Sequence, residues 1–131
     1  MKFKIARVDV PMNRSGRCYT KKLWENISKK NETYNIYIEP RGEEEEVSLT
    51  DICGIVDKIW ITAHGWVMAD AKMFENHYKW SLIAEMVANN VIKKSQIKLF
   101  PSGTGFLDEN QTVTDYTLEA FDLEIEDKKS K

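Results

Sequence analysis

The sequence has few of the residues that most often carry catalytic or metal-binding chemistry. Its 131 residues include two cysteines, Cys18 and Cys53, and two histidines, His64 and His77. Two cysteines cannot build a zinc ribbon, and a mixed site would need close Cys or His pairs that are absent here. Because the thiols of an intracellular chain stay reduced, we expect no disulfide, and we expect no metal or other cofactor.

Long apolar runs and an excess of charge of one sign are also missing. No stretch approaches the ~18 apolar residues of a membrane-spanning helix, and the first seven residues lack the apolar core of a signal peptide. The formal net charge of −2 argues against a broad basic face, so nucleic acid is not an expected partner. A protein that is neither secreted nor membrane-bound is predicted.

What is present is the composition of one globular domain. Hydrophobic residues make up 42% of the chain, which is too many for wholesale disorder and enough for a core without a metal or disulfide staple. We expect a single domain over residues 1–127, followed by a charged tail at 128–131.

Alternating apolar residues predict five or six strands. The expected strands are 2–10, 34–38, 49–62, a return strand after a two-residue turn at His64-Gly65, 95–100 and 113–125. The apolar phase slips near Ala6 and again within 113–125, and a bulge explains each slip. In the strand 49–62, Ile55, Ile59 and Ile61 are expected on one face, with Val56 and Trp60 on the other.

Two amphipathic helices complete the predicted fold. Thr20 can cap a helix that runs to about Lys30, and residues 78–90 have apolar positions at helical spacing. The segment from Pro101 to Gly105 is interpreted as a turn, because its Gly-x-Gly lacks the third glycine and the helix of a dinucleotide-binding loop. The predicted fold class is α+β, a small bent antiparallel barrel with two flanking helices.

The order of these elements resembles the prohead maturation proteases of tailed phages, the family related to herpesvirus assemblin. Residues 13–20, Asn-Arg-Ser-Gly-Arg-Cys-Tyr-Thr, are similar to that family's Asn-x-Asn-Gly-Arg-x-Tyr-Pro loop, with Thr20 in place of proline. The segment 49–60, the hairpin, the second helix, the Ser-Gly-Thr-Gly of 102–105 and the closing strand then follow in the family's order. The resemblance covers about residues 3–127, and its loop-motif positions are Asn13, Gly16, Arg17, Tyr19, Gly103 and Gly105.

The resemblance also implies where a catalytic triad would stand, and those positions are replaced. A protease of this kind needs a serine nucleophile, a histidine base and a residue that orients the base. The family's histidine falls on Glu39, and its second polar position falls on Gly54. Its two serine positions fall on Phe100 and Pro101. We therefore expect no protease activity and a Gly-x-Gly retained for backbone geometry.

A displaced catalytic set is the alternative to an inactive chain. If the alignment shifts by one residue, Ser102 becomes the nucleophile, and His64 or His77 would have to act as its base. Neither histidine matches the family's position, and Ser102 is more simply a turn residue.

The tryptophans and an acidic run are the remaining candidates for interaction. Trp66 alternates with Val67 and is expected outside the barrel, with Trp60 and Met68 on the same face. If no helix covers that row, it is an apolar patch of the kind that contacts partners. The acidic run consists of Glu43, Glu44, Glu45 and Glu46, and it is interpreted as a solvated loop.

The sequence therefore predicts a non-catalytic phage structural or assembly protein. It would bind capsid, scaffold or other virion proteins through its surface, with self-association included, in the virion or the host cytoplasm. The alternatives are a serine hydrolase around Ser102 and a small inhibitor that binds a host protein through the acidic run.

Overall fold

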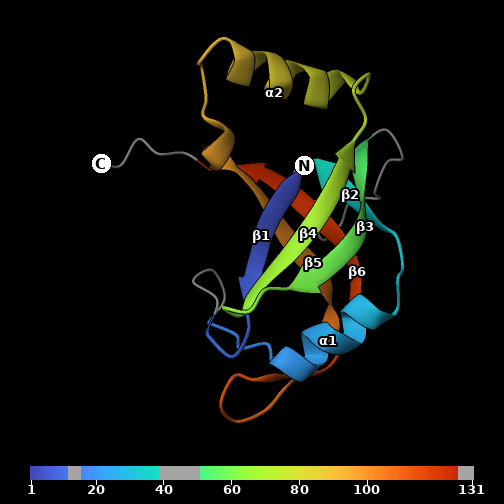
Figure 1. The fold of residues 1–131 in the computed structure, drawn as a ribbon, viewed down its shortest axis with the longest axis vertical. Helices are drawn as coiled ribbons and strands as arrows, with labels where there is room; N and C mark the ends of the chain where they lie inside the picture. Colours follow the sequence, from blue (N-terminus) through green and yellow to red (C-terminus); the bar gives the residue numbers. More distant parts are fainter. Residues whose placement is uncertain (12–15, 39–50, 127–131) are drawn as a thin grey trace.

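The strands form one mixed sheet that curls into a half-barrel (Figure 1). The computed structural model describes residues 1–11, 16–38 and 51–126. Its strands are β1 (Lys2–Arg7), β2 (Tyr34–Ile38), β3 (Ile52–Ile61), β4 (Trp66–Met73), β5 (Ile97–Leu107) and β6 (Val113–Ile125). Its helices are α1 (Lys21–Lys29), α2 (Tyr78–Ala88) and a short 3-10 helix, η2 (Lys94–Gln96). The sheet order is β1-β4-β3-β2-β6-β5.

The α+β class is confirmed, but the wholly antiparallel sheet is wrong. β2 and β6 run parallel, with Asn35 opposite Ala120 and Ile38 opposite Leu123. The other neighbours in the sheet pair antiparallel. A tight hairpin forces two strands to be antiparallel, whereas β2 and β6 are joined through most of the chain and are free to pair in either direction.

The two predicted phase slips are β-bulges. The pairing of β1 with β4 shifts between Lys4 and Ala6, which lets Ile5 and Ala6 both face the core. The pairing of β5 with β6 shifts twice, between Ser102 and Gly103 and between Thr104 and Phe106. Each bulge bends its strand, and the bends give a six-stranded sheet its curl.

A third bulge corrects the predicted faces of β3. The register with β4 shifts between Val56 and Lys58, so Val56 and Ile59 are both buried. The prediction that they face opposite sides is wrong, because the extra residue Asp57 reverses the alternation. Trp60 remains on the outer side, opposite Met68.

The predicted hairpin between β3 and β4 is confirmed, but four residues, 62–65, connect the two strands instead of two. The Thr62 N–H donates to the carbonyl of Trp66 (2.8 Å), and the Gly65 N–H donates to the carbonyl of Thr62 (3.0 Å). Gly65 has φ +83°, the left-handed conformation that closes this type of hairpin.

The predicted turn at 101–105 is wrong, because β5 continues through it. Ser102 pairs with Ala120, and Gly103 pairs with Leu118. A Cβ added at Gly103 would lie 2.1 Å from the carbonyl oxygen of Thr117. The glycine is therefore required by the close approach of β6 and not by a turn.

The helices lie at opposite ends of the sheet (Figure 1). α1 begins where the Thr20 hydroxyl accepts from the Leu23 N–H (3.2 Å), as predicted, and it buries Trp24 and Ile27. α2 buries Trp80 and Ile83. Neither helix in the described ranges is long and apolar enough to cross a membrane.

Candidate binding surface

Cations and aromatic rings alternate on the outer side of β1, β4 and β3. Directly paired residues project from the same side of a sheet, so the register gives the rows. The rows are Lys4-Met68-Trp60, Lys2-Asp70-Lys58 and Arg7-Trp66. We call the eight residues of these three rows the basic-aromatic face.

Each tryptophan of this face has two cations over its ring. The Lys4 Nζ lies 4.7 Å from the centroid of the Trp66 ring, and the Arg7 Cζ lies 5.2 Å from it. The Nζ atoms of Lys58 and Lys2 lie 5.5 Å and 5.9 Å from the Trp60 ring. Contacts within about 6 Å are attractive, so the rings hold the cations above the sheet.

This face is open to solvent along much of β1 and β4. Figure 1 draws α1 and α2 at the two ends of the sheet, and neither crosses the front of these strands. Trp60, Trp66 and Met68 are half-buried, and the cations above the two rings are exposed. The predicted outward orientation of the three apolar side chains is thus confirmed, and their role in binding stays a prediction.

The net charge of −2 conceals an uneven distribution of charge. The strands β1, β3 and β4 contain five cations and two carboxylates, namely Lys2, Lys4, Arg7, Lys58, Lys72, Asp57 and Asp70. β6 contains four carboxylates and no cation, namely Asp115, Glu119, Asp122 and Glu124. The sheet is therefore basic at one edge and acidic toward the other.

No carboxylate of the described residues neutralises the cations over the tryptophans. Asp70 contacts the N-terminal amino group of Met1 at 3.4 Å. Within the described ranges, no ion pair involves the cations that lie over Trp60 and Trp66.

A groove continues the face into the gap between β1 and β5, the two edge strands of the sheet. It has a volume of about 610 Å³. Its lining includes Lys4, Arg7 and Trp66 from the face, and Lys98 and Phe100 from β5; the other residues are Ile5, Ala6, Val10, Pro11 and Glu126. We call it the seam groove. Three cations and two aromatic rings thus line a single crevice.

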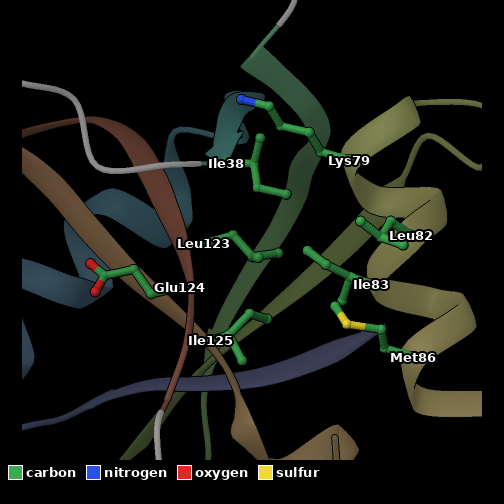
Figure 2. Close-up of a pocket in the computed structure, with 8 residues that line it drawn as sticks. All are labelled: Ile38, Lys79, Leu82, Ile83, Met86, Leu123, Glu124 and Ile125. Atoms are coloured by element: carbon green, nitrogen blue, oxygen red, sulfur yellow. The ribbon is translucent and has the colours of Figure 1, made fainter. Parts of the chain in front are cut away.

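A second groove lies between α2 and the sheet (Figure 2). Its volume is about 390 Å³, and Ile38, Leu82, Ile83, Met86, Leu123 and Ile125 form its apolar lining. Figure 2 shows Ile83 and Met86 pointing toward Leu123 and Ile125, while the Glu124 carboxylate points away from the helix. The Lys79 ammonium at its rim is paired with Asp51 (3.1 Å). Lys79 and Glu124 complete the described lining of this groove.

The residues of the displaced catalytic set lie on three different elements. His64 lies in the β3–β4 loop and His77 precedes α2, at opposite ends of the hairpin. β3 alone has 10 residues, which span roughly 30 Å at ~3.3 Å per residue. The Nδ1 atom of His77 accepts from the N–H groups of Lys79 (3.2 Å) and Trp80 (3.4 Å), so it serves as the helix cap. Ser102 lies in β5, with Ala120 opposite it.

The structure describes three of the four replaced family positions, namely Gly54, Phe100 and Pro101. A Cβ at Gly54 would lie 2.7 Å from the carbonyl oxygen of Lys72, so a polar side chain does not fit there. Phe100 lines the seam groove, and Pro101 pairs with Phe121. Glu39, Asn13 and the acidic run at 43–46 lie outside the described residues.

The two loop motifs of the resemblance meet in space. Arg17 and Tyr19 line a hollow of about 220 Å³ together with Gly103, Gly105 and Tyr116. The Tyr19 ring packs edge-to-face on Tyr116 with centroids 5.1 Å apart. Burial is the main cause that raises the pKa of Tyr116, so its hydroxyl stays protonated. We therefore interpret the hollow as a packing site at one end of the half-barrel.

Comparisons with known proteins assign no function to this chain, so a functional assignment has to rest on the residues described above. A scan against family models, a search of curated proteins and a search of solved structures each gave no match. In the part of the chain that the structure describes, no group of three or more His, Cys, Asp or Glu residues is arranged to hold a metal ion.

Proposed function

We propose that this chain is a non-catalytic binding protein that works through the basic-aromatic face. The observation that carries the proposal is the pair of half-buried tryptophans, each beneath two cations that no carboxylate of the described residues neutralises. Tryptophan and arginine are the residues most enriched at binding hot spots. Half-buried rings beside exposed cations favour a partner that has both flat or apolar groups and negative charge.

The resemblance to prohead proteases suggests the biological setting in which the binding would occur, which is a phage particle. A chain that keeps the family's order of elements without its catalytic residues would act by contact in the assembly or structure of a phage particle. Self-association belongs to the same proposal, because the acidic strand β6 complements the basic-aromatic face of a second copy.

A serine hydrolase around Ser102 has less support. A nucleophile must be within hydrogen-bond reach of its base. The two histidines lie at opposite ends of the β3–β4 hairpin, and one already caps α2 through Nδ1. No described feature favours the inhibitor alternative either, since the acidic run lies outside the described residues.

The absence of catalysis is tested with a serine-directed fluorophosphonate probe and fluorogenic ester and peptide substrates. We expect neither labelling nor turnover above that of heat-unfolded protein. Labelling that Ser102→Ala abolishes and that depends on His64 or His77 would overturn the non-catalytic proposal.

The setting is tested in purified particles of the phage that encodes the chain. We expect mass spectrometry to find the protein at a copy number tied to capsid symmetry. Incorporation should fall in Trp66→Ala and Arg7→Gln variants and stay unchanged in Lys21→Gln, which removes an exposed cation on α1. Equal incorporation of all variants would refute a role for the face in assembly.

A further inference from the structure

We propose that the basic-aromatic face and the seam groove together bind single-stranded nucleic acid. The inference rests on the proposed function, because it names the partner class of the same surface. It also revises the expectation drawn from net charge, which averages over a basic edge and an acidic strand.

The cations are placed to follow a phosphate backbone. Lys4 and Arg7 line the seam groove from β1, and Lys98 lines it from β5. Lys2 and Lys58 extend the positive charge onto the outer side of the sheet, on either side of Asp70, which contacts the Met1 amino group. Among the described residues that line the groove, Glu126 is the one carboxylate. A positively charged channel of this kind attracts a polyanion without reading its sequence.

The rings are placed to receive bases. Trp60 is opposite Met68, and Trp66 is two residues from Met68 on the same strand, so the two tryptophans are diagonal neighbours. Diagonal neighbours on a sheet are ~7–8 Å apart, and long aromatic side chains bridge such a gap. Phe100 adds a third ring inside the seam groove. Successive unpaired bases can stack on such rings, whatever their identity.

Only the combination of cations and rings distinguishes a single-stranded nucleic acid from a duplex or an acidic polypeptide. A double helix offers phosphates but hides the faces of its bases, so the tryptophans would add nothing. An acidic polypeptide pairs with lysine and arginine but has no series of flat rings to stack. A single strand offers both, and the Lys and Arg groups over the rings can move to its phosphates while bases take their place.

The test is a titration of the full chain with fluorescein-labelled oligothymidylate of 15 nucleotides, followed by anisotropy and by tryptophan emission. We expect saturable binding with quenching of the tryptophans. If four cations contact phosphates, a slope of about −0.7 per contact predicts a roughly 50-fold loss of affinity between 50 and 200 mM salt. Removing one contact lowers that loss to roughly 18-fold.

Variants separate stacking from charge. Trp66→Ala should weaken binding about tenfold or more, and Trp66→Phe should restore most of it, because a base stacks on either ring. Arg7→Gln should weaken binding and reduce the salt dependence. Lys21→Gln on α1 is the matched control and should stay within about twofold of the unmodified chain at equal salt. Far-UV circular dichroism checks that each variant is folded.

Three outcomes would overturn the inference. The first is no binding of the oligonucleotide at 50 mM salt, and the second is binding without tryptophan quenching and with equal affinity for a duplex. The third is equal competition by poly-glutamate, which would assign the face to an acidic protein. All three leave the non-catalytic proposal standing, because its test is labelling at Ser102.

Discussion

Replacing Gly103 by alanine tests whether residues 101–105 form a strand. The added Cβ would lie 2.1 Å from the carbonyl oxygen of Thr117 and 2.9 Å from the Tyr116 ring. Carbon atoms pack favourably at ~3.5–4.0 Å, so β5 and β6 would have to separate by more than 1 Å. The obstacle is backbone, which cannot rotate away as a flexible side chain can.

The expected cost is near the upper end of the range for overpacking, about 3 kcal/mol. For 131 residues at ~2.1 cal/mol/K per residue, this cost lowers Tm by about 11 °C. Thermal unfolding followed by far-UV circular dichroism measures the shift. Gly105→Ala should cost less, because its nearest contact would be 3.1 Å.

Gly16→Ala is the matched control. No described atom outside its two chain neighbours lies within 4 Å of its Cβ position, but φ is +71°, so a left-handed penalty of about 1 kcal/mol applies. A Gly103→Ala protein that melts within about 3 °C of the unmodified chain would refute the strand. The segment would then be the turn that the sequence predicts.

Two further predictions concern the core and α2. Burial raises the pKa of the Cys53 thiol from 9.0 to about 12. The contribution of this thiol to the free energy of unfolding is therefore complete below pH 9 and is lost as the pH rises from 9 toward 12. Urea unfolding at stepped pH should show this loss, and the same pH dependence in Cys53→Ala would contradict it. In α2, Ile83→Ala should cost about 2–4 kcal/mol, whereas Leu82→Ala, one residue away and 58% exposed, should cost less than about 0.5 kcal/mol. Similar melting temperatures for these two variants would mean that α2 is not docked through Ile83.

Local signals predicted the elements that depend on local physics. The strands Tyr34–Ile38 and Val113–Ile125 have the predicted bounds, and Thr20 caps α1 as expected. The bulges in β1 and β6 were visible as slips in alternation. The sequence predicts that this strand ends at residue 100, because Pro101 and the two glycines that follow are typical of a turn. β5 nevertheless continues to Leu107, since proline is tolerated on an edge strand.

Long-range features could not be predicted in the same way. Nothing near Asn35 indicates that its parallel partner is Ala120, because that pairing depends on how the whole sheet closes. The sequence predicts only the aromatic part of the basic-aromatic face. Its tryptophans were found by alternation, but the cations were averaged into a net charge of −2, although Lys-Phe-Lys-Ile-Ala-Arg already places Lys2 and Lys4 on one side of a strand.

The position of β6 has a consequence for how the protein is made. β6, the last strand in the described part of the chain, lies inside the sheet between β2 and β5, and it is synthesised well after its parallel partner β2. A nascent chain that lacks β6 holds only β1 to β4 as a paired set, and β5 then has no neighbour in the sheet. The sheet can therefore close only after β6 has left the ribosome, and its folding rate should be that of a topology dominated by distant contacts.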